Sequence, residues 1–246
     1  MRFTVMHKVD AKMEAGAPPD QQIIEAMGSL VQESMKSGQF ITGAGLHRSQ
    51  KRVRVKNSGG EVSVTAGPYT GENELLASYA MIKVRSLEQA LPHVQRFARA
   101  SGDCEIEAGP VVEPWDLGMM PKPSGDVPLQ VLLLTKADAR FERGDASNAQ
   151  RVSALKVLAD SLGDSGALLA SGVLAPSSQA VRSRPAPAPA KRTWVDGPFA
   201  ESKELIAGFS VLDEPSLQAA IAWADRYAAI LVDSEVDVRP LLDEPA

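Results

Sequence analysis

The chain has 246 residues, a net charge of −5 and 44% hydrophobic residues, a composition typical of a globular protein. The negative charge argues against nucleic acid or an anionic membrane as a partner, because both would repel this surface on average. No apolar run reaches the roughly 18 to 20 residues of a membrane span. The first residues read like a strand and not like a signal peptide, so we expect a cytoplasmic protein.

The sequence contains no motif for metal or cofactor chemistry. The single cysteine, Cys104, excludes an intramolecular disulfide and a thiolate metal cluster. The three histidines, His7, His47 and His93, lack the close spacing at which imidazoles share a metal ion. Phosphate-loop, nucleophile-elbow and dinucleotide motifs are absent as well. The sequence therefore predicts no metal site and no cofactor.

The predicted elements of the first half alternate between strands and helices. A strand over 3–7 precedes a helix that begins at the N-cap candidate Asp20 and ends at Gly38. Valines on both sides of an Asn-Ser-Gly-Gly turn at 57–60 predict a β-hairpin. Its first arm, 51–56, alternates valine with Lys and Arg and predicts a half-exposed strand with a basic outer face. Three elements follow: a strand over 78–84, a helix from the N-cap candidate Ser86, and a strand near 105–112.

The second half repeats this order at an offset of about 130 residues. The segments 37–42, 66–69 and 105–107 recur at 165–170, 196–199 and 235–237. The predicted elements of this copy are a strand over 131–135, a helix before Gly166, a strand over 209–212, a helix from Ser216 and a strand over 235–238. Prolines fill 184–190, where the hairpin should be. Because proline cannot donate to a strand ladder, we expect a hairpin that is lost or loosened into an extended loop.

Each copy has the element order β-α-β-β-α-β of the ferredoxin-like, or split βαβ, unit. The helices of such a unit cover one face of its sheet, and the other face needs a partner. We therefore expect an α+β protein with two domains, residues 1–116 and 129–246, joined by a proline-rich linker over 117–128. Their sheets should pack face to face as an intramolecular pseudo-dimer.

One long motif carries a family resemblance. Residues 194–205 read Trp-Val-Asp-Gly-Pro-Phe-Ala-Glu-Ser-Lys-Glu-Leu and resemble the signature of the YCII-related, or DGPF, domain family. Shorter segments at 43–47, 111–118 and 236–240 look like other parts of that domain. The resemblance implies the dimeric α/β-barrel fold, with a cleft between sheet and helices that holds an aspartate and sometimes a histidine. It implies little about activity.

The first copy departs from this signature. Ala66 stands where the second copy has Asp196, and Gly109 stands where it has Arg239. We infer a degenerate first copy that supports a better preserved second copy.

Two residues are candidates for proton transfer. Asp196 belongs to an Asp-Gly-Pro turn, where its carboxylate either caps the local backbone or acts as a general base or ligand acceptor. His7 ends the first strand and could reach a cleft as a general acid or base, although a structural histidine is the default interpretation.

Four further residues are candidates for ligand binding. Arg239 could bind a ligand carboxylate through two parallel hydrogen bonds, or pair with Asp196 or Glu235 across neighbouring strands. Lys203 is the residue of its solvated segment that we expect to face a ligand. Phe199 is either a core anchor or part of a ligand cage. His47 follows a Gly-Ala-Gly-Leu stretch and is a second histidine candidate for acid–base chemistry.

Three functions remain open. The protein is a small-molecule-binding or accessory protein, with a small acidic or aromatic ligand in a cleft near the DGPF turn of the second repeat. Alternatively, it is an enzyme of lyase or isomerase type that moves a proton with Asp196 or His7. A third alternative is a non-catalytic scaffold whose proline-rich loop, 184–190, meets a protein partner. The sequence also leaves further homodimerisation open.

Overall fold

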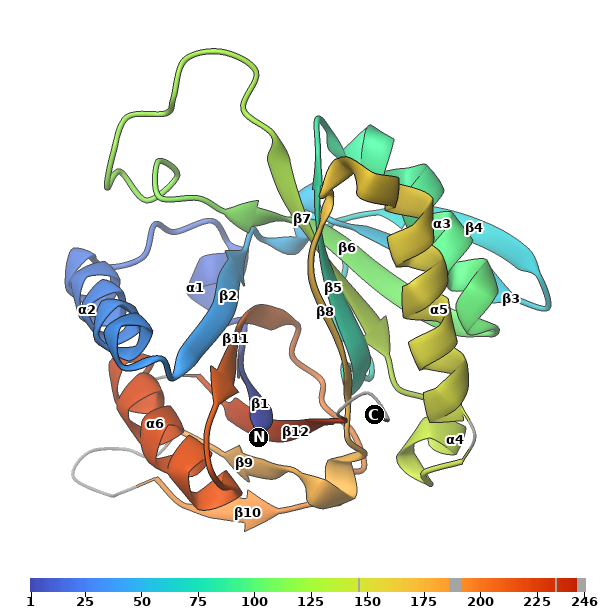
Figure 1. Ribbon diagram of the computed structural model, residues 1–246. Coiled ribbons are helices and arrows are strands. Elements are labelled where there is room, and N and C mark those ends of the chain that lie inside the picture. Colours follow the sequence, from blue (N-terminus) through green and yellow to red (C-terminus); the bar gives the residue numbers. More distant parts are fainter. Residues whose placement is uncertain (146, 186–191, 233, 243–246) are drawn as a thin grey trace.

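The computed structural model describes residues 1–145, 147–185, 192–232 and 234–242. It shows a mixed α/β protein in which antiparallel strands close into a barrel (Figure 1). Helices lie against the outer surface of this barrel on two opposite sides.

The elements follow the two sequence repeats. Those of the first repeat are β1 (Arg2–Lys8), α1 (Ala11–Glu14), α2 (Gln21–Ser37), β2 (Phe40–Leu46), the 3₁₀ turn η1 (Ser49–Lys51), β3 (Val53–Ser58), β4 (Glu61–Ala66), β5 (Leu76–Val84), α3 (Leu87–Ser101) and β6 (Cys104–Val112). Those of the second repeat are β7 (Leu129–Lys136), α4 (Ala139–Glu142), α5 (Ser147–Leu162), η2 (Gly163–Ser165), β8 (Leu168–Leu174), η3 (Ser177–Gln179), β9 (Val181–Ser183), β10 (Trp194–Asp196), β11 (Ile206–Asp213), α6 (Leu217–Ile230) and β12 (Val236–Leu242).

The predicted helix ends are confirmed. The Asp20 carboxylate accepts a hydrogen bond from Gln22 N at 2.8 Å, and Gly38 ends α2 with φ of 79°, a backbone conformation that favours glycine. Ser86 and Ser216 cap α3 and α6 in the same way as Asp20 caps α2. These caps satisfy amide groups that have no partner within their own helix.

The two hairpins differ in length. In the first repeat, β3 and β4 meet at a two-residue turn, Gly59-Gly60, and both glycines have positive φ, as this turn type requires. In the second repeat, three residue pairs still join β9 to β10. The second hairpin is therefore shortened rather than lost. Residues 186–190 of its proline-rich segment lie outside the described residues.

Within the described part of the chain, the barrel strands follow the order β1-β11-β2-β6-β7-β5-β8-β12, and β12 pairs with β1 to close the ring. Each neighbouring pair is antiparallel. Strand direction therefore alternates around the ring, so β1 and β7 run in the same direction. Their C-terminal ends lie at the same end of the barrel, which we call the mouth.

The two repeats exchange strands within this barrel. β1 lies between β11 and β12 of the second repeat, and β7 lies between β5 and β6 of the first repeat. One half of the barrel is thus β12-β1-β11-β2 and the other is β6-β7-β5-β8. Each half is built from both repeats.

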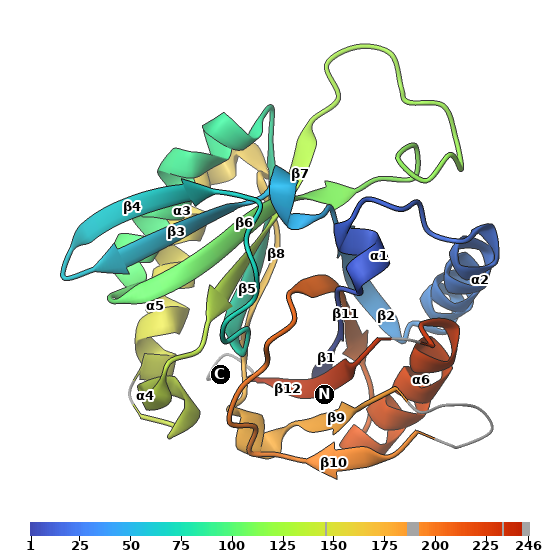
Figure 2. The same ribbon diagram turned by 180° about the vertical axis from the view of Figure 1, so that it is seen from behind.

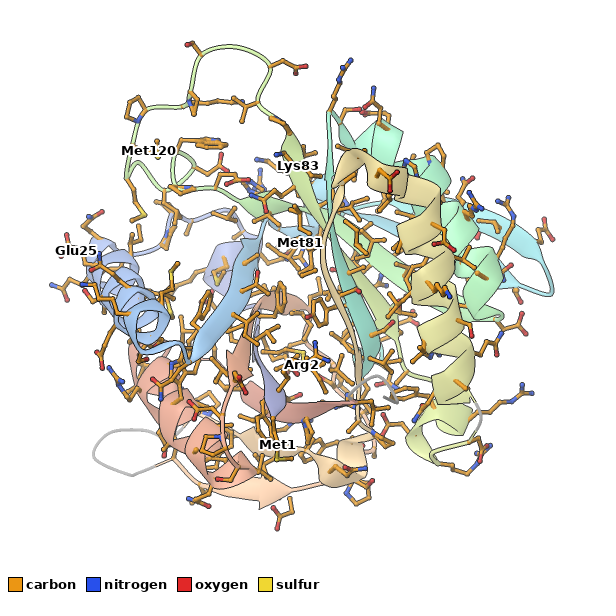
Figure 3. All side chains as sticks on the ribbon, viewed as in Figure 1. Met1, Arg2, Glu25, Met81, Lys83 and Met120 are labelled. Carbon is orange, nitrogen blue, oxygen red and sulfur yellow. The ribbon has the colours of Figure 1, made fainter. Side chains whose placement is uncertain are left out.

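Among the described residues, three apolar cores hold the layers together. Helices α3 and α5 cover one half of the barrel, and α2 and α6 cover the other (Figure 2). The third core fills the barrel, where Met81 lies among inward-facing side chains (Figure 3). At its centre the rings of Tyr79 and Phe209, which are counterparts in the two repeats, lie 5.0 Å apart. The interior of the barrel is therefore a packed core and not an open channel.

Strand exchange predicts that neither repeat folds well alone. Separately produced segments 1–116 and 129–246 each leave one strand, β1 or β7, without the neighbours on both sides that it has in the barrel. We expect both segments to be poorly folded alone and to form a folded one-to-one complex when mixed. Circular dichroism and analytical ultracentrifugation measure this directly. Two folded, monomeric segments without mutual affinity would contradict the exchanged arrangement.

Candidate functional site

The Asp-Gly-Pro-Phe turn of the second repeat packs against η3. Phe199 N donates a hydrogen bond to Ser177 Oγ at 3.1 Å. A Cβ atom on Gly197 would lie 1.8 Å from the carbonyl oxygen of Ser177, and one on Gly67 of the first repeat would lie 1.8 Å from that of Ser49. Only glycine permits such an approach. The glycine of the motif therefore has a structural role in both repeats.

Asp196 ends β10 with an exposed side chain. It pairs with Val181, which belongs to the core beneath α2 and α6, so its carboxylate lies on the side of the β9–β10 hairpin that faces away from the barrel interior. Arg239 follows Val238 along β12, and Val238 belongs to that same outer core. Arg239 therefore points inward. The structure does not bring Asp196 and Arg239 together.

Arg239 is engaged by protein groups. Its side chain is 1% exposed. Its guanidinium donates to the carbonyl oxygens of Ala175 (3.1 Å) and Leu76 (2.7 Å) and to the Glu142 carboxylate (3.3 Å). The pairing with Asp196 or Glu235 that the sequence left open is not formed, because Glu142 of α4 takes that role.

Phe199 and Lys203 lie on the same connection but in different surroundings. The guanidinium carbon of Arg182 lies 4.2 Å from the centre of the Phe199 ring, a cation–π contact. Lys203 is 70% exposed and lies 3.2 Å from the exposed Glu201 carboxylate. Phe199 thus packs against a buried charge, whereas Lys203 remains available at the surface.

A buried cluster of charges lies behind Phe199. Arg182 donates two hydrogen bonds, of 2.6 and 2.9 Å, to the two oxygens of Asp237, and Lys8 Nζ lies 3.3 Å from the same carboxylate. All three side chains are at most 5% exposed. Burial acts to raise the pKa of Asp237, but Lys8 and Arg182 outweigh it and hold that pKa below its usual range.

The first repeat has the equivalent cluster. Lys136 and Arg54 each lie 2.8 Å from Glu74, and Arg52 lies 2.5 Å from Glu107. The predicted basic outer face of 51–56 is therefore wrong for Arg52 and Arg54. Arg52 is buried and the Arg54 side chain is only 12% exposed, because the carboxylates of the neighbouring segments neutralise them.

Both clusters lie at the mouth, since Lys8 and Lys136 are the last residues of β1 and β7. The loops that precede β5 and β11 also meet there. Glu74 N donates to the Ser202 carbonyl at 2.6 Å, and Ser202 N lies 3.4 Å from Asn73 Oδ1. The mouth is therefore closed by one loop from each repeat.

His7 precedes Lys8 on β1 but points to the opposite face of the strand, toward α6. Its side chain is 8% exposed, and its Nδ1 lies 2.6 Å from the hydroxyl of Tyr227 on α6. Burial lowers its pKa to about 4, against the opposing effect of Asp10. Three strand spacings separate β1 from β10, about 14 Å in total. His7 and Asp196 therefore do not share one site.

A pocket of about 510 Å³ contains His47. It lies between η1, the ends of β4 and β6, the start of α3 and the segment 113–128, which connects the repeats. Its polar lining includes Lys51, Lys122, Glu113 and Asp116, and its apolar lining includes Val53, Leu87, Val111, Trp115, Val127 and Leu129. Ala66, the counterpart of Asp196, also lies on its wall.

His47 is oriented by two charged neighbours. Its Nε2 lies 3.2 Å from Asp116 Oδ2, and its Nδ1 lies 3.5 Å from Lys51 Nζ. Burial is the main cause that lowers the pKa of His47, Lys51 adds to it, and Asp116 opposes both. The imidazole is therefore neutral near pH 7, with an Nε2 proton that points to Asp116 and an Nδ1 lone pair that faces Lys51.

The second repeat cannot provide the same chemistry. The counterparts of His47 and Lys51 are Ala175 and Gln179. The sequence placed a ligand near the DGPF turn of the second repeat, whereas the pocket described here lies beside the corresponding turn of the first.

The buried charges were missed by motif analysis. A signal was present in the repeat itself, because charge type is kept at four pairs of counterparts: Lys8 and Lys136, Arg54 and Arg182, Glu105 and Glu235, Glu107 and Asp237. Comparison of the two copies position by position would have found these residues. The pocket side chains of the linker, residues 117–128, have no counterpart in the other repeat, so this comparison would not find them.

The fold is thus a closed antiparallel α/β barrel built from two related repeats. The model of the YCII-related domain family matches residues 1–112 and 129–241, and the chain belongs to that family. Neither the curated proteins nor the solved structures that were compared with the chain gave a match. Within the described ranges, no helix is long and apolar enough to cross a membrane, and no group of three or more His, Cys, Asp or Glu could hold a metal ion.

Substitutions in the DGPF turn should show that Gly197 is needed for stability and that the Asp196 carboxylate is not. Gly197→Ala should lower the free energy of unfolding by about 1–3 kcal/mol or more, because the new methyl group overlaps the Ser177 carbonyl. Asp196→Ala should change it by less than about 0.5 kcal/mol, because the side chain is exposed. Urea unfolding of both variants measures this. The reverse order of effects would show that the carboxylate holds the turn.

The buried His7 should make the fold sensitive to acid. Its pKa of about 4 lies below the value of 6.5 that it has when exposed. The unfolded state therefore binds more protons between these values, and stability falls as the pH drops from 6.5 to 4. The loss should be on the order of 3 kcal/mol.

His7→Gln is the matched control, because its amide oxygen can accept from the Tyr227 hydroxyl without titrating. Urea unfolding at pH 7 and pH 4.5 should show a steeper loss for the wild type than for this variant. Equal losses would mean that His7 does not resist protonation in the folded state.

Proposed function

We propose that this YCII-related protein binds a small carboxylate with an apolar body in the His47 pocket. The observation that supports this most is the side-by-side placement of Lys51, neutral His47 and an apolar wall in one pocket. The Lys51 ammonium group, which His47 holds in the pocket, suits a carboxylate. The wall suits an aromatic or aliphatic body.

The lining of the pocket carries two lysines and two carboxylates, and the lysines are the groups that suit an anion. Its two carboxylates already have partners: Asp116 contacts His47, and Glu113 accepts a hydrogen bond from Gln130 at 3.2 Å. Lys51 and Lys122 add two positive charges to the lining. A ligand with a negative head and an apolar body would complement both parts of the lining.

A ligand-dependent thermal shift tests the proposal. Benzoate and hexanoate at about 100 times their dissociation constants should stabilise the wild type by roughly 2.7 kcal/mol, a shift of a few degrees. Lys51→Gln, which copies Gln179 of the second repeat, should reduce the shift, whereas Asp196→Asn should keep it. Loss of the shift in Asp196→Asn alone would move the site to the DGPF turn. No shift in the folded wild type with any carboxylate would overturn the proposal.

The contact between His47 and Asp116 favours a second candidate, an enzyme of lyase or isomerase type. A carboxylate that orients a neutral imidazole is the arrangement of a general base. Such a base should exchange a proton at a carbon that lies between the ligand carboxylate and a second carbonyl group, which stabilises the carbanion. Deuterium incorporation at that carbon of a bound 3-oxo carboxylate, faster than without protein and lost in His47→Ala while binding persists, would favour this candidate. Binding without incorporation in the wild type would favour a binding protein.

The strand order also supports a more detailed proposal for the architecture of the barrel. The strand order β12-β1-β11-β2 places the fourth, first, third and second strands of a β-α-β-β-α-β unit side by side, and β6-β7-β5-β8 does the same. We interpret the two halves as two ferredoxin-like units that form an intramolecular pseudo-dimer with exchanged strands. A protein partner at 184–190, further homodimerisation and a cytoplasmic location stay predictions from the sequence.

A further inference from the structure

Arg52 joins three segments around the pocket. Its side chain is 1% exposed. Nε donates to the carbonyl oxygen of His47. Nη1 donates to the carbonyl oxygen of Ile206, at 2.9 Å, and to the Glu107 carboxylate, at 2.5 Å. One guanidinium thus connects the loop that carries His47 to β6 and to β11 of the other repeat.

Arg239 makes two of these three connections in the second repeat, and its carboxylate partner is Glu142 of α4. Its Nε donates to the carbonyl of Ala175 and its Nη1 to the carbonyl of Leu76. Ala175 is the counterpart of His47, and Leu76 is the counterpart of Ile206. The two guanidinium groups therefore occupy equivalent places in the fold.

The two arginines nevertheless come from different positions of the repeat. The counterpart of Arg52 is Ala180, and the counterpart of Arg239 is Gly109. A Cβ atom on Gly109 would lie 2.7 Å from Arg52 Cγ, closer than such contacts allow. Each repeat thus holds one arginine in this place and a small residue at the alternative position.

We infer that Arg52 is the positioning residue of the His47 pocket, and that an arginine at position 109 can replace it once Arg52 is removed. The first repeat has glycine at position 109 in place of the arginine of the second repeat, but it keeps the guanidinium group, which comes from Arg52 instead. The inference rests on the proposed function only where it treats the pocket as a ligand site.

Two variants of the full chain test this, Arg52→Ala and the double variant Arg52→Ala with Gly109→Arg. The first readout is the pKa of His47, measured by an NMR pH titration of the protein without ligand. Lys51 and Asp116 are left in place in both variants. In Arg52→Ala the pKa of His47 should rise by about half a unit or more, because a nearby cation is lost and the loop becomes more exposed. Benzoate affinity should fall about fivefold or more. The double variant should return both values close to those of the wild type.

Arg239→Ala is the matched control. It removes the same kind of hydrogen bonds from the second repeat, so it should lower the melting temperature and leave the titration of His47 unchanged. A folded Arg52→Ala protein with a wild-type His47 titration would overturn the inference. So would a double variant that is no closer to the wild type than the single one.

A variant that does not fold and a wild type that does not bind benzoate lead to different conclusions. If Arg52→Ala does not fold, recovery of folding in the double variant supports the inference, and failure of both variants overturns it. If benzoate does not bind the wild type, the proposed function fails for this probe. The His47 titration still decides whether Arg52 positions the pocket.

Discussion

The hydrogen bonding of β1 and β7 is the constraint on which the barrel depends. Each strand is buried between two strands of the other repeat, so its backbone amides and carbonyls find partners only when both repeats are present. This arrangement brings counterpart residues face to face inside the barrel, as Tyr79 and Phe209 show. It also brings the loops of both repeats together at the mouth. The packing of the barrel interior and the closed mouth both follow from this exchange.

A nearly symmetric scaffold carries unequal chemistry. At the mouth, both repeats keep a lysine, an arginine and acidic residues, and they differ by small changes such as Glu107 for Asp237. The pocket depends on features of the first repeat alone, His47 and Lys51, and on the connecting segment that supplies Asp116. The two repeats thus provide two similar scaffolds. Single-residue differences and the segment that connects the repeats give only the first scaffold this pocket.

Local features were predictable because their signals are local. Asp20 as a helix cap and Gly59-Gly60 as a hairpin turn depend on neighbouring residues alone. Strand partners were not predictable, because alternation gives the face of a strand and not its neighbour. Arg52 illustrates the limit, since its alternation with valine indicated an exposed side chain until the acidic strand beside it was known. The DGPF motif drew attention to its carboxylate, whereas the structure shows that its glycine is sterically required.

The segment 113–128 connects two strands that are already neighbours. It joins β6 to β7, which pair Pro110 with Val131, and the counterpart pair, Pro240 with Phe3, lies between β12 and β1. The two gaps in the ring are therefore equivalent. A circular permutant that is opened in 117–128 and linked between β12 and β1 would preserve each barrel pairing. The order of the repeats along the chain is then a property of the gene and not a requirement of the fold.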